Sequence, residues 1–299
     1  LGYIKRNPLS LYRAQRRGGK GKTGMTTREE DFVENLFVAN THDRLLFFTD
    51  KGKVYSLKVY EIPQAGRATR GKAIVNLLNL EKGERVQTVL SIREFEEDKF
   101  IVIATKRGQV KKTSLSAYAN IRSNGLIACE LDKDDKVISA VLTDGSKELL
   151  LVSRAGKAVR FKEGQVRSMG RATRGVRGIN LADDDRLVAM EVVSPGTTIF
   201  ICTENGYGKR TKVEEYTLHN RGGQGMMAMK LTDKTGLIVG VLQVRDEDEV
   251  MLISNQGKII RMKVKDIPVI GRVTQGVRLI GLEEGERVTS ICRVIENGE

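Results

Sequence analysis

The chain alternates between short apolar runs and basic stretches, with a tight turn between them. Five apolar runs, LLFFT, FIVIAT, LLLVS, TIFICT and VMLIS, each lead into a turn of the form Ser/Thr-x-x-Gly, and a basic segment of alternating residues follows each turn. A period of two around a turn glycine is typical of a β-hairpin, because glycine adopts the positive φ that such turns need. The pattern predicts β-hairpins, and the lack of any sustained helical period excludes a helical solenoid.

The turn glycines recur at nearly constant spacing. They are Gly2, Gly52, Gly108, Gly156, Gly206 and Gly257, separated by 50, 56, 48, 50 and 51 residues. A second glycine, a short apolar strand, an acidic turn and a closing apolar strand complete each unit. Six such units predict an all-β, six-bladed β-pinwheel, propeller-like, with four strands per blade and a single domain over residues 1–299. The unit at Gly2 lacks its first strand, so we expect a fragment of a longer polypeptide.

A second periodicity spans two units. The offset from the turn glycine to the second glycine alternates between 17 and 19 residues. The second glycines are Gly19, Gly71, Gly125, Gly175, Gly223 and Gly276. Even units share the loops GRATRG (66–71), GRATRG (170–175) and GRVTQG (271–276), whereas units one and five share RRGGKG (16–21) and NRGGQG (220–225). We infer a two-blade super-repeat that is present three times.

Charge narrows the class of partner. The chain has 51 Lys and Arg against 38 Asp and Glu, a formal net charge of +13. A surplus of this size favours a polyanion, with nucleic acid ahead of an acidic membrane. No apolar run approaches the roughly 18 residues of a membrane span, and the charged start LGYIKRNP has no signal-peptide core. We expect a cytoplasmic protein with no membrane partner.

Residue types that carry chemistry are scarce. Cys129, Cys202 and Cys292 lie far apart in apolar runs, as buried thiols do in a reducing compartment. With only His42 and His219 as histidines, a zinc site is not expected. The Gly-Lys-Thr at 21–23 lacks the first glycine of a phosphate-binding loop. We predict no metal, no cofactor and no catalytic residues.

One segment concentrates cations and glycines. It comprises Gln15, Arg16, Arg17, Gly18, Gly19, Lys20, Gly21 and Lys22. Glycine lets the backbone approach a phosphate closely, Arg offers a bidentate fork, and Lys adds a point charge. The alternatives are a solvated basic loop and an RGG-type RNA-binding segment. The segment is therefore a candidate phosphate-binding loop.

The heptad QRRGGKG (15–21) resembles the signature of the C-terminal domain of the DNA gyrase A protein. The segments EEDFVENLFVANTHD and GKVYSLKVYEIP resemble that family too, and the six-unit register extends the resemblance over the whole chain. The resemblance implies a non-catalytic domain of an ATP-dependent type IIA topoisomerase. Such a domain wraps double-stranded DNA around a basic rim with a positive sense and directs negative supercoiling. The heptad, residues Gln15 to Gly21, is needed for that wrap.

The resemblance also implies partners and a location. In the full enzyme the partners are the ATPase subunit of gyrase and the N-terminal part of the same polypeptide, at the nucleoid; the isolated domain is expected to be monomeric. Unit five has Gln224 where unit one has Lys20, which weakens a second heptad-like anchor. Two alternatives remain: a topoisomerase IV-like C-terminal domain that binds DNA without strong wrapping, and a propeller scaffold that docks acidic proteins.

Further DNA contacts are assigned from the repeat pattern rather than from the resemblance. On the hairpins they are Lys53, Lys111, Lys112, Arg160, Lys209, Arg210, Lys258 and Arg261. In the loops they are Arg67, Arg70, Arg171, Arg174, Arg221 and Arg272. The alternative for each is an edge charge that keeps sheets from aggregating.

Overall fold

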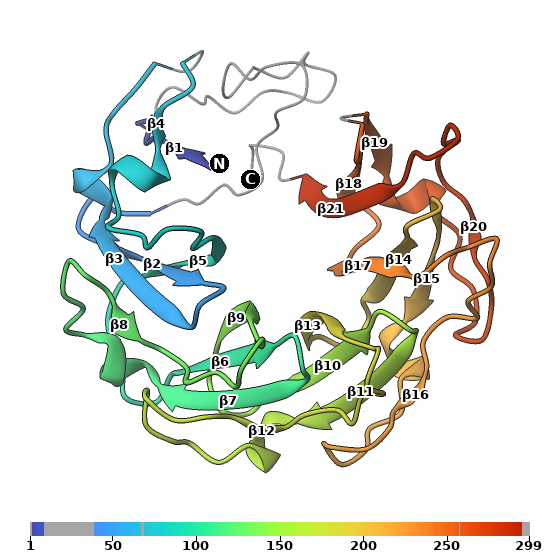
Figure 1. Cartoon of the computed structure of the whole chain (residues 1–299), viewed down its shortest axis with the longest axis horizontal. Coiled ribbons are helices and arrows are strands. Elements are labelled where there is room, and N and C mark those ends of the chain that lie inside the picture. The colour runs from blue at the N-terminus through green and yellow to red at the C-terminus, as the bar shows by residue number, and fades with distance from the viewer. Residues whose placement is uncertain (1, 9–38, 67–68, 257, 295–299) are drawn as a thin grey trace.

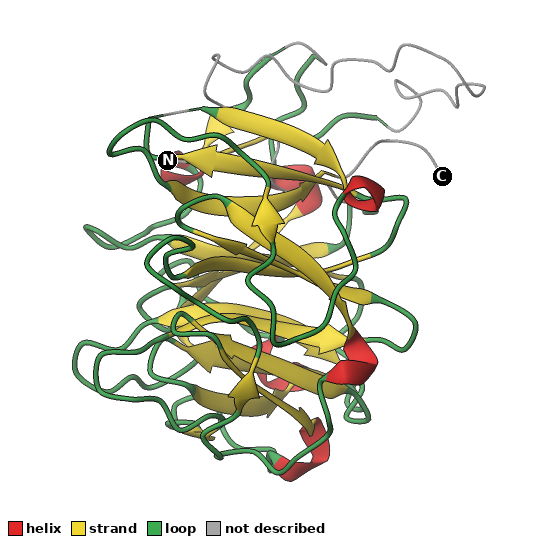
Figure 2. Cartoon of the chain, turned by 90° about the vertical axis from the view of Figure 1, so that its right-hand side faces the viewer, coloured by secondary structure: helices red, strands yellow, loops and turns green. Residues whose placement is uncertain are grey.

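Small antiparallel sheets follow one another around a common centre, in chain order (Figure 1). The computed structural model describes residues 2–8, 39–66, 69–256 and 258–294. Figure 2 shows the same arrangement from the side, with the strands of successive sheets in stacked layers. The predicted all-β, propeller-like class is confirmed.

The strands are short and of similar length in every repeat. Their bounds are β1 (Tyr3–Ile4), β2 (Arg44–Thr49), β3 (Lys53–Lys58), β4 (Lys72–Ala73), β5 (Val86–Ile92), β6 (Phe100–Thr105), β7 (Gln109–Ser114), β8 (Leu126–Ile127), β9 (Val137–Thr143), β10 (Glu148–Ser153), β11 (Lys157–Lys162), β12 (Val176–Arg177), β13 (Leu187–Val193), β14 (Thr198–Thr203), β15 (Tyr207–Lys212), β16 (Met226–Met227), β17 (Ile238–Val244), β18 (Glu249–Ser254), β19 (Ile259–Lys263), β20 (Val277–Arg278) and β21 (Val288–Val294). The 3₁₀ turns are η2 (Val59–Glu61), η3 (Ile74–Asn76), η4 (Leu115–Tyr118), η5 (Glu163–Gln165), η6 (Val213–Glu215) and η7 (Val264–Asp266).

Four sheets have the predicted four strands. Their orders are β5-β2-β3-β8, β9-β6-β7-β12, β13-β10-β11-β16 and β17-β14-β15-β20. Within the described ranges, the last sheet has the three strands β19-β18-β21 and the first has only β1 and β4. Among the described residues, four strands per blade is therefore confirmed for four sheets.

The four strands of one sequence unit do not form one sheet, which corrects the repeat as predicted. The short strand β8 pairs with β3, the hairpin strand of the preceding unit, in the register Lys53↔Ile127 and Val54↔Leu126. The same crossover joins β12 to β7, β16 to β11 and β20 to β15. Each unit thus covers the outer edge of its predecessor, so neighbouring blades are joined by backbone pairing as well as by side-chain packing.

The Ser/Thr-x-x-Gly signature has a direct structural cause. The Thr203 hydroxyl oxygen accepts the backbone N–H of Tyr207, four residues on, at 3.2 Å. Gly206, inside this turn, has φ +78°, and a Cβ there would lie 2.5 Å from Cγ2 of Ile280 in the next unit. The glycine is required both by the turn and by the close approach of the following blade.

The structure corrects one register. In unit five the outer strand β16 begins directly after Gly225, just as β8 begins after Gly125 and β12 after Gly175. Gly225 has φ +77° and lies 19 residues after Gly206, so it is the second glycine of this unit rather than Gly223. The alternating offset of 17 and 19 is therefore wrong, and any two-unit period must rest on other features.

The core lies between neighbouring sheets. Val152 on β10 and Ile201 on β14 are buried in one cluster with Val241 on β17. The innermost strands β5, β9, β13, β17 and β21 contact one another in sequence around the centre. Cys129, Cys202 and Cys292 are all buried, as predicted. Among the described residues, the apolar faces of neighbouring sheets pack against each other.

Candidate nucleic-acid interface

The outer rim is formed by the short strands β8, β12, β16 and β20 and by the loops that precede them (Figure 1). Each of these loops connects a 3₁₀ turn to the outer strand of the preceding blade. The predicted heptad, Gln15, Arg16, Arg17, Gly18, Gly19, Lys20 and Gly21, lies outside the described residues, as do Lys22 and Arg67.

Two predicted DNA contacts point into the molecule. Lys111 is 1% exposed and Lys209 is 0% exposed. The Lys111 ammonium donates to the backbone oxygens of Ala128, at 2.6 Å, and Arg171. Burial lowers the pKa of Lys111 and of Lys209 to about 8. A side chain without exposed surface cannot reach a phosphate, so both residues are removed from the predicted interface.

On each of the strands β7, β11 and β15, the residue that follows this position donates hydrogen bonds to the neighbouring blade. Arg160 Nη1 donates to the carbonyls of Val213, at 2.9 Å, and Tyr216, at 3.0 Å, which are the first residue of η6 in the next unit and the residue directly after it. Arg210 Nε donates to the Ile267 carbonyl after η7 at 2.8 Å. Lys112 and Arg210 are 7% and 4% exposed. Lys112, Arg160 and Arg210 therefore cap 3₁₀ turns. The prediction of Lys112 and Arg210 as DNA contacts is corrected because both are buried, whereas the half-buried Arg160 remains a predicted contact.

Lys112 repeats this geometry one blade earlier. Its ammonium donates to the Glu163 carbonyl of η5 at 3.2 Å and lies 5.1 Å from the Phe100 ring centroid. The Glu163 carbonyl also accepts the Val166 N–H within its own turn at 2.9 Å, so Lys112 is a second donor to that oxygen and comes from the preceding blade. Positive charge in the hairpins thus partly serves inter-blade contacts.

Arginines of the rim loops donate hydrogen bonds to the neighbouring outer strands. Arg221 Nη1 donates to the Arg177 carbonyl of β12 at 2.9 Å. Arg171 Nη1 donates to the Ile127 carbonyl of β8 at 3.3 Å, and Arg272 Nη1 donates to the Met227 carbonyl of β16. Each arginine therefore links its own loop to the outer strand that precedes it in sequence. These three residues lie at the rim and are half-buried.

Other predicted residues are exposed and paired with carboxylates. Arg174, with 58% of its side chain exposed, lies 3.1 Å from Asp132 and 3.5 Å from Glu130. Lys258 and Arg261 are 42% and 44% exposed and pair with Glu286 and Glu249. Exposed ion pairs stabilise a protein by about 0–1 kcal/mol, so a phosphate can compete for these cations.

The Arg70 guanidinium lies 3.9 Å from the Tyr3 ring centroid.

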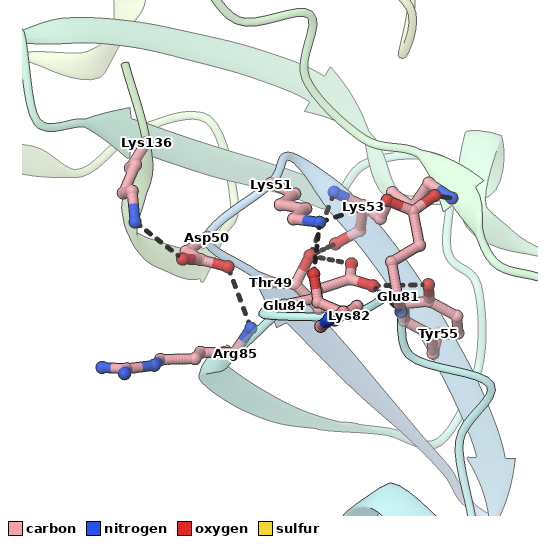
Figure 3. Close-up of polar contacts among 10 residues, drawn as sticks. All are labelled: Thr49, Asp50, Lys51, Lys53, Tyr55, Glu81, Lys82, Glu84, Arg85 and Lys136. Atoms are coloured by element: carbon pink, nitrogen blue, oxygen red, sulfur yellow. Dashed lines mark hydrogen bonds and ion pairs between the residues drawn. The ribbon is translucent and has the colours of Figure 1, made fainter. Parts of the chain in front are cut away.

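Lys53 belongs to a tighter network at the first complete hairpin (Figure 3). Its ammonium lies 2.6 Å from Glu81, which Lys51 also contacts at 3.4 Å. Behind this pair, the buried Glu84 accepts hydrogen bonds from Thr49 at 2.5 Å and Tyr55 at 2.9 Å. Two lysines therefore share one carboxylate here, and the acidic turn compensates part of the hairpin's charge.

Comparison with known proteins decides the family. The chain matches the family model described as DNA gyrase C-terminal domain, beta-propeller, in six segments: 1–40, 43–93, 99–144, 147–194, 197–245 and 248–291. The chain belongs to this family. The matched segments follow the six repeats derived above.

Relatives of this DNA gyrase C-terminal domain are longer proteins. The DNA gyrase A proteins of Salmonella typhimurium strain LT2 and Escherichia coli strain K12 are each 48% identical over 295 residues. The DNA gyrase A protein of Staphylococcus aureus is 44% identical over 300 residues. These alignments cover 99% of this chain, which spans about a third (34%) of each relative.

Two solved structures share the fold. The C-terminal domain of DNA topoisomerase IV matches with a TM-score of 0.88 and 30% identity, over 99% of this chain and 91% of that one. The DNA gyrase A C-terminal domain matches with a TM-score of 0.73 and 25% identity, over 98% of this chain and 97% of that one. Both comparisons support the pinwheel assignment.

Several cations on the rim of this gyrase-family domain were not predicted from the sequence. Arg177 on β12, Arg278 on β20 and Lys72 on β4 are exposed. Arg278 also donates to the Tyr207 hydroxyl at 3.2 Å, which helps to lower the pKa of that phenol. A sequence signal for these cations was available. In each case a basic residue follows the second glycine of the unit within two positions, in the short strand that was predicted only as apolar.

The described part of the chain contains no cluster of His, Cys, Asp and Glu that could hold a metal ion. Across the same residues, no helix is long and apolar enough to cross a membrane.

Proposed function

We propose that this domain binds double-stranded DNA along its outer rim and wraps it with a positive sense, so that it directs negative supercoiling by DNA gyrase. The observation that carries the proposal is the 48% identity to a DNA gyrase A protein over 99% of the chain. The net charge of +13 and the exposed cations of the rim support a polyanionic ligand. The domain acts without catalytic residues of its own.

Wrapping requires many contacts rather than a few strong ones. DNA has a persistence length of about 150 bp, so tight bending of a 20–30 bp segment costs about 1–6 kcal/mol. Contacts from several blades offset this cost, and they fall mainly on phosphates. Binding is therefore largely independent of sequence and weakens steeply with salt.

The proposal includes the surroundings of the domain. It is the C-terminal part of a longer polypeptide, acts with the N-terminal part of that polypeptide and with the ATPase subunit of gyrase, and works in the cytoplasm at the nucleoid. As an isolated domain it is monomeric. The relatives' greater length supports the first of these points.

A topoisomerase IV-like role, with DNA binding but little wrapping, is the second candidate. The observation in its favour is the TM-score of 0.88 to the topoisomerase IV C-terminal domain, against 0.73 to the gyrase A domain. The two roles differ in whether bound DNA acquires a chiral path.

Substitution of the heptad cations tests the role of the heptad in wrapping. We expect Arg16→Ala, Arg17→Ala and Lys20→Ala together to abolish wrapping and leave the circular dichroism spectrum unchanged, because wrapping depends on this phosphate anchor. Binding and wrapping are measured on nicked plasmid.

The matched control removes three exposed lysines from acidic turns, Lys82→Ala, Lys133→Ala and Lys234→Ala. It makes the same change in net charge and should keep the wrap. Unchanged DNA binding and wrapping in the heptad variant would contradict the proposal.

A further inference from the structure

Lysines occupy one position in alternate hairpins, where Lys111 and Lys209 are buried and Lys5 is half-buried. Lys5, Lys111 and Lys209 each lie three residues after a turn glycine, in units one, three and five. In units two, four and six this position holds Tyr55, Val159 and Ile260. The G-R-x-T loops belong to the even units, so each lysine precedes one of them. This alternation restores the two-unit period that the glycine offsets do not give.

Every lysine of this set donates into the loop of the following unit. The Lys209 ammonium contacts the Gly271 carbonyl at 2.9 Å, the Arg272 carbonyl, and the Thr274 hydroxyl at 3.3 Å. Lys111 contacts the Arg171 carbonyl in the equivalent loop. Lys5 contacts the carbonyls of Gly66 at 2.9 Å and Thr69 at 2.7 Å. The lysine position and the loop type are matched across the blade boundary.

The loops have a matching internal bond. The threonine hydroxyl of each G-R-x-T segment donates to the glycine carbonyl three residues earlier, at 2.8 Å in all three loops. The backbone of loop 271–276 therefore turns its carbonyls toward Lys209, while Val273 is 57% exposed on the outside. In loop 170–175 the outward residue Arg174 is 58% exposed. These contacts of Lys5, Lys111 and Lys209 with the G-R-x-T loops are called the clamp. The clamp thus determines which groups the loop presents at the rim.

Burial of an ammonium group is costly unless oxygen atoms surround it. Tyr55, Val159 and Ile260 fill the same position in alternate hairpins, so packing there does not need a lysine. The inward carbonyls of the G-R-x-T loop supply the reason for the charge.

We infer that Lys111 and Lys209 are positioning residues: each fixes the G-R-x-T loop of the next unit in the shape that faces DNA at the rim. The DNA part of this inference rests on the proposed function, whereas the clamp is a property of the domain alone. It follows that the rim contacts DNA with a period of two blades.

The test combines a structural and a functional measurement on the 299-residue chain. In Lys209→Met, hydrogen–deuterium exchange of the amides in 271–276 should rise at least about tenfold, because buried carbonyls lose their donor. The linking-number shift per bound domain, measured by sealing nicked plasmid, should fall by roughly a third, and by roughly two-thirds in Lys111→Met with Lys209→Met. DNA affinity at low salt should stay within about threefold, since most phosphate contacts remain.

Ile260→Met is the control, because it changes the same hairpin position in a unit without the clamp. It should alter neither measurement. Unchanged exchange in Lys209→Met overturns the clamp, and faster exchange with an unchanged linking shift per bound domain overturns the positioning role. If Lys209→Met does not fold, Lys111→Met removes the equivalent contact to loop 170–175 and is judged by the same two measurements. A wild-type domain that gives no linking shift overturns the proposed function, while the exchange result still decides the clamp.

Discussion

Lys209 and Arg174 have the same formal charge and opposite surroundings. Lys209 is 0% exposed among loop oxygens, whereas the Arg174 side chain is 58% exposed beside Asp132 and Glu130. Basic side chains of the hairpins and loops therefore divide between inter-blade contacts and the surface. Only the second group can neutralise phosphates, so the residues that bind DNA are fewer than the charge pattern predicts.

Glu191 on β13 gives a residue-scale prediction about pH. Its carboxylate accepts the Gln243 N–H of β17 at 3.3 Å, and burial raises its pKa to about 7 despite the opposing effect of Arg293. Because the folded pKa lies above the unfolded value of about 4.5, the ionised form is disfavoured in the folded state. Stability from this group is complete below pH 4.5 and falls as the pH rises to about 7. Glu191→Gln should raise the free energy of unfolding by up to about 3 kcal/mol at pH 8 and little at pH 4.5.

Denaturant titrations at both pH values measure this difference. Glu214→Gln is a control of opposite sign, because the hydrogen bond from the Gly196 N–H, at 3.0 Å, lowers the pKa of Glu214. That substitution should destabilise the domain at pH 8. An equal effect of Glu191→Gln at the two pH values would refute the account of this buried carboxylate.

At the scale of elements, the repeated unit is a hairpin whose outer edge is covered by the next unit. Thr203 sets the turn, Gly206 adopts the positive φ, and the chain at Ile280 packs against that glycine. Turn, outer strand and following blade therefore depend on one another. A change at the turn glycine should affect the blade boundary as well as the hairpin.

Gly206→Ala tests this dependence. Its Cβ would meet Ile280 Cγ2 at 2.5 Å, in addition to the cost of a positive φ. Gly196→Ala is the matched control, with φ +74° and no atom within 4 Å of the new Cβ. We expect Gly196→Ala to cost about 1–2 kcal/mol and Gly206→Ala at least about 1 kcal/mol more, measured by denaturant unfolding. Equal costs would show that the blade boundary is not tightly packed there.

Local sequence signals predicted the hairpins but not their partners. The Ser/Thr-x-x-Gly turn and the alternation after it are short-range features, so strands such as β14 and β15 were predictable. The pairing of β8 with the hairpin of the preceding unit was not, since periodicity identifies a strand and not its neighbour. Lys111 and Lys112 are both buried, and their alternating context GQVKKTS resembles an exposed edge strand. The one available signal was the recurrence of lysine in odd units alone.

For the whole molecule, blade-to-blade contacts fix a curved rim. Backbone pairing of outer strands, capping of 3₁₀ turns by Arg160 and Arg210, and ion pairs such as Arg154–Glu204 at 3.0 Å join successive blades. The whole sequence has a surplus of 13 positive charges. Under the proposed function, a curved and basic rim would bend bound DNA, and a pitch between blades would give its path a handedness.

The most direct test of DNA wrapping is the linking number of plasmid sealed in the presence of the domain. Nicked circular DNA is incubated with the 299-residue chain, sealed with ligase and freed of protein. We predict a positive shift that grows with protein concentration and fades as salt rises, because each neutralised phosphate adds about −0.9 to the slope of log K against log salt. Binding without any shift in linking number would contradict the wrap and favour the topoisomerase IV-like role.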